Sequence, residues 1–161
     1  MTQFQELIRV LVKGQVELII VGGAAATAHG SARLTEDLDL VYRRTLDNVG
    51  RLISVLAPYK PYLRGAPQGL PFQWEERTLR SGLNFTLTTL LGPLDLLGEI
   101  AGGGGYEELL PYCVRLHIFE VDCLCLGLER LIQVKRASGR PKDFEVIAEL
   151  EAILEERERD E

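Results

Sequence analysis

The sequence of 161 residues predicts an α+β fold with α/β-like features, in which helices flank a mixed β-sheet and a pair of helices follows it. Two observations favour this class. Short apolar runs rich in β-branched residues indicate buried strands, and other segments repeat apolar residues every three or four positions, as helices do. The length fits a single domain over residues 1–161, with a sheet-containing core at 1–126 and C-terminal helices at 127–161.

The first third of the chain alternates helix and strand. Residues 3–13 predict an amphipathic helix that ends near Gly14, because apolar residues recur at helical spacing. Three further segments are expected to be a buried strand, a short helix former and a second strand: residues 16–21, 24–28 and 37–42. Thr45 can cap the helix that follows, which runs to about Leu56.

The middle and the end contain shorter elements. Proline and glycine indicate a loop over residues 58–72, and one or two helical turns follow at 74–80. Strands are expected at residues 83–90, 94–97, 114–119 and 121–126, which gives a sheet of about four to six strands. Helices are expected at residues 128–137 and 141–156. The glycine run 102–105 is interpreted as a connector rather than as a mobile flap.

The bulk composition is that of an ordinary soluble globular protein. No window resembles a transmembrane span or a secretory signal, so the expected compartment is the cytoplasm and no membrane partner is expected. A net charge of −6 argues against binding duplex nucleic acid by bulk electrostatics. Cys113, Cys123 and Cys125 lack zinc-ligand spacing and are expected to lie in the core.

Two acids one residue apart, Asp37 and Asp39, give the clearest indication of chemistry. Alternate residues of a strand share a face, so both carboxylates point the same way and need a cation. Hard oxygen ligands favour Mg²⁺ with phosphate oxygens in its shell. Gly22 and Gly23 permit close approach of the backbone to a phosphate, although a tight strand–helix turn would also use them. Flanking Leu34 and other apolar residues argue against a solvated edge strand.

Residues 22–41, GGAAATAHGSARLTEDLDLV, resemble the polymerase-β-like nucleotidyltransferase superfamily. The similarity is to small bacterial members, the minimal nucleotidyltransferases and the abortive-infection toxin-like transferases. It implies the nucleotidyltransferase fold and an enzyme dependent on Mg²⁺ (or Mn²⁺). Such an enzyme moves a nucleoside monophosphate from an NTP to an acceptor hydroxyl and releases pyrophosphate.

The resemblance leaves the acceptor and the biological role open. The acceptor could be a tRNA 3′ end, a protein or a small molecule. The chain could be the toxin of a toxin–antitoxin pair, with a cognate antitoxin or small helical protein as its partner. The alternatives are a catalytically inactive nucleotide-binding or regulatory module and a purely structural interaction domain.

The resemblance also implies a third carboxylate from a later strand. Asp95 is the best candidate, because it is the only acid in the apolar segment 80–98. Glu99 and Asp122 are weaker alternatives, and Pro93 is expected to limit strand pairing beside Asp95. The expected catalytic and metal-binding residues are therefore Asp37, Asp39 and Asp95.

The expected nucleotide-binding residues are Gly22, Gly23, Arg33, Thr35 and Lys135. Arg33 could contact phosphate or be an exposed loop arginine. Lys135 faces an apolar stripe, as Asp143 does, so the two could form an interhelical ion pair or Lys135 could reach phosphates. Three basic residues could add a patch facing a triphosphate or an RNA end: Arg136, Arg140 and Lys142. His29 favours a helix-end or core role over catalysis.

Overall fold

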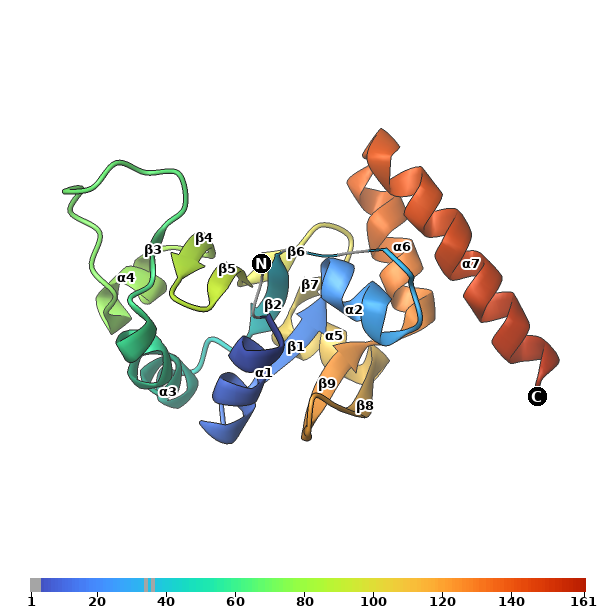
Figure 1. Cartoon of the computed structure of the whole chain (residues 1–161), viewed down its shortest axis with the longest axis horizontal. Helices are drawn as coiled ribbons and strands as arrows, with labels where there is room; N and C mark the ends of the chain where they lie inside the picture. The colour runs from blue at the N-terminus through green and yellow to red at the C-terminus, as the bar shows by residue number, and fades with distance from the viewer. Residues whose placement is uncertain (1–3, 34, 36) are drawn as a thin grey trace.

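The computed structural model describes residues 4–33, 35 and 37–161, and it contains a mixed seven-stranded sheet with helices around it (Figure 1). The strand order is β3-β4-β5-β2-β1-β9-β8. The predicted α+β class and the mixed sheet with a C-terminal helical pair are confirmed. Asp37 and Asp39 lie where one of the central strands begins.

Four strands form the centre of the sheet. β1 (Leu18–Val21) is antiparallel to β2 (Leu38–Tyr42). On their outer sides, β2 pairs in parallel with β5 (Gly92–Leu97) and β1 pairs in parallel with β9 (Val121–Leu126). The remaining strands are β3 (Tyr62–Leu63) and β4 (Asn84–Thr89) beyond β5, and β8 (Cys113–Ile118) beyond β9.

The helices gather around this sheet. They are α1 (Phe4–Lys13), α2 (Gly22–Ala28), α3 (Leu46–Leu56), α4 (Glu76–Ser81), α5 (Tyr106–Leu109), α6 (Leu128–Ser138) and α7 (Phe144–Arg159). Short 3-10 turns occupy Ala57–Tyr59, Leu110–Tyr112 and Pro141–Asp143. In Figure 1, α6 and α7 lie at one end of the molecule and α3 and α4 at the other. None of the helices in the described residues has both the length and the apolar character needed to cross a bilayer.

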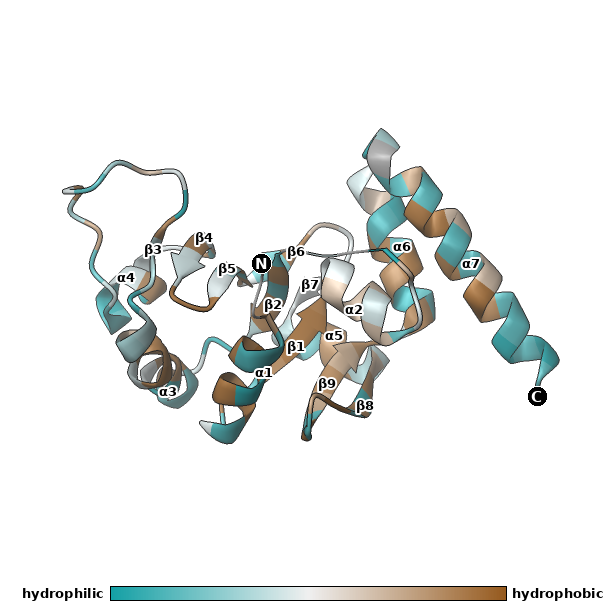
Figure 2. Cartoon of the chain, in the orientation of Figure 1, coloured by the Kyte–Doolittle hydropathy of each residue, from teal (hydrophilic) through white to brown (hydrophobic). Residues whose placement is uncertain are grey.

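The core follows the apolar runs of the sequence. Every residue of β1 is buried, and α1 buries Leu7, Ile8 and Leu11 at the expected helical spacing. Figure 2 shows this as hydrophobic colour on β1 and β9, whereas the C-terminal end of α7 is hydrophilic. Cys123 and Cys125 are buried, and Cys113 is half-buried, so the expectation of core cysteines is confirmed.

Several predicted boundaries differ from the structure. Gln3 lies outside the described residues, and β1 begins at Leu18, two residues later than expected. The predicted loop 58–72 contains strand β3, which is too short for a periodic signal. The segment 106–112 contains α5 and a 3-10 turn that the sequence did not reveal.

The expectation that Pro93 limits pairing is wrong. Pro93 lies opposite Thr88 of β4, and β5 pairs with strands on both sides. Proline lacks only its own N–H, so a proline near the start of a strand leaves the ladder that follows intact. Asp95 is therefore on a central strand.

The glycine run forms a turn and one strand of a small hairpin. β6 (Glu99–Ile100) pairs antiparallel with β7 (Gly104–Gly105). A Cβ on Gly102, whose φ is +78°, would lie 2.4 Å from the Cβ of Ala137 in α6. Glycine at position 102 therefore allows this hairpin to pack closely against α6.

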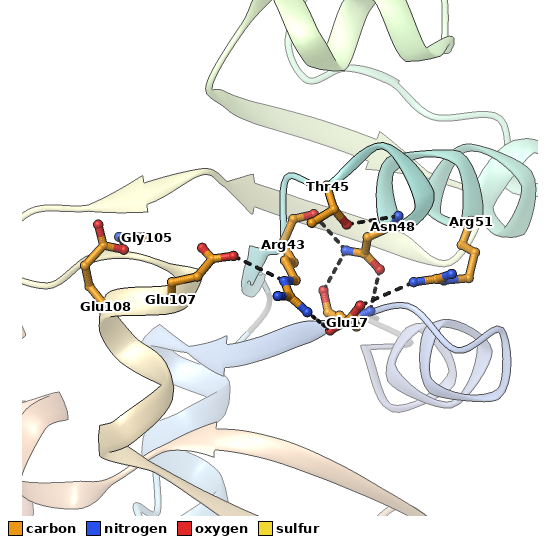
Figure 3. Close-up of polar contacts among 8 residues, drawn as sticks. All are labelled: Glu17, Arg43, Thr45, Asn48, Arg51, Gly105, Glu107 and Glu108. Atoms are coloured by element: carbon orange, nitrogen blue, oxygen red, sulfur yellow. Dashed lines mark hydrogen bonds and ion pairs between the residues drawn. The ribbon is translucent and has the colours of Figure 1, made fainter.

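A polar network fixes the ends of β1 and β2 that lie away from Asp39 (Figure 3). The buried Asn48 side chain accepts from the Glu17 backbone N–H at 2.6 Å and donates to the Glu17 and Arg43 carbonyls at 2.9 and 2.8 Å. Thr45 caps α3 as expected, by accepting from the Asn48 N–H at 3.3 Å. This network fastens the register that places Val21 opposite Asp39.

Candidate active site

Strand register brings two of the predicted acids together. Asp39 of β2 lies directly opposite Asp95 of β5 in a parallel pair. Neighbouring strands are about 4.8 Å apart and opposite residues share a face, so these carboxylates are close neighbours. Asp37 immediately precedes β2 and its side chain is 51% exposed. We call Asp37, Asp39 and Asp95 the acid trio.

Among the acid trio, Asp39 has the environment that most disfavours a negative charge. Burial, and then the neighbouring Asp95 and Asp37 carboxylates, raise the pKa of Asp39 to about 7, while Lys135 acts in the opposite direction. Its Oδ1 atom is buried without a hydrogen-bond partner among the described residues. The ionised form of Asp39 would therefore be stabilised by a nearby cation.

Arg64 supplies the nearest cation. Its Nη2 atom donates to Asp95 Oδ1 at 2.6 Å, and its Nη1 atom lies 3.7 Å from Asp37 Oδ2. Arg64 was not predicted from the sequence, because it lies in the segment 58–72, which was interpreted as a loop. Strand β3 directly precedes Arg64, but its two residues are too few to give a recognisable strand pattern.

At Gly22 and Gly23, neighbouring side chains lie too close to the backbone to leave room for a Cβ atom. A Cβ on Gly22 would lie 2.3 Å from Asp39 Oδ2, and Gly22 has a φ of +64°. A Cβ on Gly23 would lie 2.7 Å from the Thr35 hydroxyl oxygen. The turn between β1 and α2 is therefore pressed against Asp39 on one side and Thr35 on the other.

A cavity of about 290 Å³ opens beside Asp39 and Gly22. The β6–β7 hairpin and α6 form its walls, with apolar side chains and the polar groups Glu99, Lys135 and Asp143. A second cavity of about 120 Å³ is lined by Gly23, Arg33, Thr35 and Lys135, among others. Lys135 lines both cavities. The structure thus gathers all five predicted nucleotide-binding residues around adjoining cavities.

Of the two alternatives for Lys135, the interhelical ion pair with Asp143 is not formed in the structure. Asp143 instead accepts from Ser138 Oγ at 3.0 Å. Within the described part of the chain, no carboxylate oxygen lies within 4.0 Å of Lys135 Nζ. The chain turns through a 3-10 segment between the helices, which shifts Asp143 relative to a continuous helix.

Arg33 is anchored to α7. Its guanidinium lies 3.1 Å from Glu145 and 3.8 Å from Glu149. Glu149 also accepts from Ser31 Oγ at 2.6 Å and from the Ala32 N–H at 3.1 Å, and these bonds lower its pKa. The last helix therefore holds the loop that leads to the acid trio.

His29 has a structural position at the end of α2. Its Nε2 atom lies 2.8 Å from the Leu126 carbonyl, and Arg157 contacts its Nδ1 atom at 3.3 Å. Burial is the main cause that lowers the pKa of His29. A neutral ring that donates from Nε2 and accepts at Nδ1 satisfies both contacts. This placement agrees with the expected helix-end or core role.

The weaker candidates lie outside the acid trio. Glu99 lines the larger cavity, and Asp122 pairs with His117 at 2.7 Å on an exposed hairpin. In the predicted basic patch, Arg140 lines the larger cavity and Arg136 pairs with Glu151. The side chain of Lys142 and all of Leu34 lie outside the described residues.

The acid trio fits a divalent cation in its chemistry. It offers hard carboxylate oxygens, and the buried Oδ1 of Asp39 has no hydrogen-bond partner among the residues that the structure describes. Within the described residues, no three acid, His or Cys side chains converge as a preformed metal site. Arg64 contacts Asp95 and lies 3.7 Å from Asp37.

The raised pKa of Asp39 predicts a pH dependence of stability. The folded state holds a proton at Asp39 that the unfolded state releases near pH 4, so the metal-free fold loses stability from about pH 4 to about pH 7. One proton gives a slope of at most about 1.4 kcal/mol per pH unit. Urea unfolding of wild type and Asp39→Asn at several pH values would measure it. A difference between them that does not change with pH would contradict the expectation.

Comparison with solved structures identifies the fold. Eight chains match the structure. A lincosamide antibiotic adenylyltransferase, LnuA, with lincomycin bound, has a TM-score of 0.63 and 14% identity over 94% of this chain and 96% of its own. A Thermotoga maritima protein assigned to the nucleotidyltransferases has a TM-score of 0.55 and 14% identity over 92% and 94%.

The antibiotic-resistance factor ANT(2″)-Ia, solved in solution, has a TM-score of 0.53 and 14% identity over 98% of this chain and 92% of its own. No protein-family model and no curated protein sequence matches the chain. The structural similarity over nearly the full length of the chain agrees with the resemblance read from residues 22–41. The chain has the fold of these nucleotidyltransferases.

Proposed function

We propose that this chain is a Mg²⁺-dependent nucleotidyltransferase that moves a nucleoside monophosphate from an NTP to an acceptor hydroxyl. The observation that carries the proposal is the register of β2 and β5, which sets Asp39 beside Asp95 next to the Gly22 turn. Mn²⁺ would serve as an alternative cation. When bound, the metal would neutralise charge on the phosphates and lower the pKa of the attacking group.

The residues of the chain have distinct roles in this proposal. Asp37, Asp39 and Asp95 would hold the metal, and Asp95 would orient the acceptor hydroxyl and take its proton. The turn at Gly22 and Gly23 would let the phosphates approach the backbone.

Lys135 is the side chain best placed for the triphosphate. It lines both cavities and acts electrostatically on Asp39, so a phosphate beside the acid trio would lie near its ammonium group. Thr35 and Arg33 line the smaller cavity and would contribute polar contacts there.

Lys135→Met is expected to raise the apparent KM for NTP by about tenfold or more, because a hydrogen bond to a charged group contributes about 1.5–3 kcal/mol. The effect on kcat is expected to be smaller. Steady-state kinetics over a range of NTP concentrations would measure both. Lys13→Met, which removes the same charge from an exposed position at the end of α1, serves as the control. Equal KM values for the two variants would exclude this role.

Among the acceptor classes, a small molecule has the most support. The neighbour LnuA was solved with lincomycin bound, and the larger cavity here mixes apolar walls with charged groups of both signs, Glu99, Asp143, Lys135 and Arg140. Such a lining suits an acceptor with both apolar and polar parts. A tRNA 3′ end, a protein acceptor and a toxin role with a cognate antitoxin or small helical partner stay predictions of the sequence.

One observation favours the second candidate, an inactive nucleotide-binding module. Arg64 contacts Asp95 and lies near Asp37, which are two of the acids that catalysis needs. If Arg64 never left them, the chain could bind a nucleotide without transferring it.

Transfer assays with labelled NTPs separate the two candidates. Wild type and Asp95→Ala would be incubated with Mg²⁺ or Mn²⁺ and with RNA, protein and small-molecule acceptors, and a chelator would serve as the metal control. Metal-dependent labelling that Asp95→Ala abolishes would support the enzyme. NTP binding by calorimetry without transfer to any acceptor, unchanged in Asp95→Ala, would support the binding module.

A further inference from the structure

The acid trio already faces an internal cation. Arg64 Nη2 is 2.6 Å from Asp95 Oδ1, and Nη1 is 3.7 Å from Asp37 Oδ2. The arginine and Asp95 side chains are 28% and 23% exposed, so the contact is mostly shielded from water. A charge pair in such a place is screened much less than one on the open surface.

Several bonds hold Arg64 in this position. Its backbone N–H donates to the Thr86 carbonyl at 3.0 Å, which continues the pairing of β3 with β4. Its Nη2 and Nε atoms both donate to the Leu87 carbonyl, at 2.7 and 3.1 Å. The guanidinium is therefore aimed at Asp95 by β4, the strand on the other side of β5.

One guanidinium does not balance the acid trio when all three acids are ionised. Within the described residues, Asp39 Oδ1 is buried without a hydrogen-bond partner, so the ionised trio has a deficit of positive charge. A divalent cation could remove the deficit, but it would bind the Asp95 carboxylate that Arg64 already contacts through Oδ1. Two cations at one carboxylate would repel each other strongly in a partly buried site.

We propose that Arg64 is the resident counter-ion of the acid trio and that a divalent cation binds there by displacing the guanidinium from Asp95. This inference rests on the proposed function, because it assumes that the acid trio is the metal site. Arg64 limits repulsion between the acids before the metal arrives. It also weakens metal binding, because the Arg64–Asp95 contact must first be broken.

Mn²⁺ titrations of Arg64→Met test the proposal, with the unbound ion measured by electron paramagnetic resonance. We expect this variant to bind Mn²⁺ at least about tenfold more tightly than wild type, since a competing cation has been removed. Arg9→Met is a matched control, because Arg9 is 26% exposed and pairs with Glu6 at 2.8 Å on α1. Its Mn²⁺ affinity is expected to equal that of wild type.

Thermal unfolding gives a second readout that requires no activity. Without metal, Arg64→Met is expected to melt below wild type because the acids lose their counter-ion. Saturating Mn²⁺ is expected to raise its Tm by more than it raises that of wild type, because tighter binding stabilises the folded state more. If Arg64→Met does not fold, Arg64→Lys is the second variant. It keeps the positive charge but cannot bond to Asp95 and the Leu87 carbonyl in the fixed geometry of a guanidinium, so its Mn²⁺ affinity is expected to exceed that of wild type.

The outcomes separate this inference from the function beneath it. If wild type and both Arg64 variants bind Mn²⁺ with equal affinity, the counter-ion role is overturned and the metal site stands. If none of them binds Mn²⁺, both the counter-ion role and the proposed metal-dependent transfer are overturned. A structure with Mn²⁺ bound to the acid trio and Arg64 still within 2.6 Å of Asp95 would also contradict displacement.

Discussion

Asp39→Asn is expected to reduce nucleotidyl transfer by at least about 1,000-fold while making the metal-free protein more stable. The side chain keeps its shape but loses the charge that would hold the metal. Burial, and then repulsion from Asp95 and Asp37, raise the pKa of Asp39 to about 7, and both penalties disappear with the charge. The amide can also donate a hydrogen bond to Asp95.

The gain in stability should be visible above pH 7, where Asp39 is charged in the wild type. A gain of about 2 kcal/mol would raise Tm by roughly 5 °C for a chain of this size. Calorimetry at pH 8 without divalent ions would measure the gain. Transfer to whichever acceptor the wild type modifies would measure the loss.

Asp47→Asn is the control for this experiment. Asp47 is exposed on α3, and the change removes one negative charge in the same way. Both activity and Tm should stay near the wild-type values. If Asp39→Asn retained activity within tenfold of wild type, the assignment of the acid trio to metal binding would be lost.

Asn48→Leu is expected to lower the free energy of unfolding by roughly 3–5 kcal/mol, because three backbone groups lose a buried hydrogen-bond partner. The Glu17 N–H and the Glu17 and Arg43 carbonyls all bond to this side chain, as Figure 3 shows. Leucine offers neither a donor nor an acceptor. A loss of this size is a large part of the stability of an ordinary domain.

Urea unfolding followed by circular dichroism would measure this change. Gln5→Leu replaces an amide by the same apolar side chain at an exposed position of α1, and it should change stability by less than about 0.5 kcal/mol. Equal unfolding midpoints for the two variants would show that the network in Figure 3 does not stabilise the fold.

Local pattern predicted most elements of the sheet and the helices. The spacing of Leu7, Ile8 and Leu11 identified α1, and the apolar run before Gly22 identified β1. These signals depend on residues within one or two turns, or on alternation along one strand, so a single sequence contains them. Strand β3 and helix α5 were missed because two to four residues are too few to establish a period.

The candidate site was predicted in part for the same reason. Asp37 and Asp39 could be placed together because two residues of one strand share a face. The need for glycine at position 22 was also readable, although the structure gives a further cause, the Asp39 carboxylate pressed against its Cα. The alternative in which Lys135 pairs with Asp143 is wrong, because it placed Asp143 in the last α-helix, whereas residues Pro141–Asp143 form a 3-10 turn.

The sequence by itself determined the class of fold, the pair of acids at the start of β2 and the glycine turn beside them. Only the tertiary structure decided that Asp95 lies opposite Asp39, that Lys135 borders both cavities and that Arg64 reaches the acids. Those positions join segments 27 to 96 residues apart, and they depend on strand register and on the paths of loops. Such contacts are set by the packing of the whole chain, whereas the propensity of a residue acts only on its near neighbours.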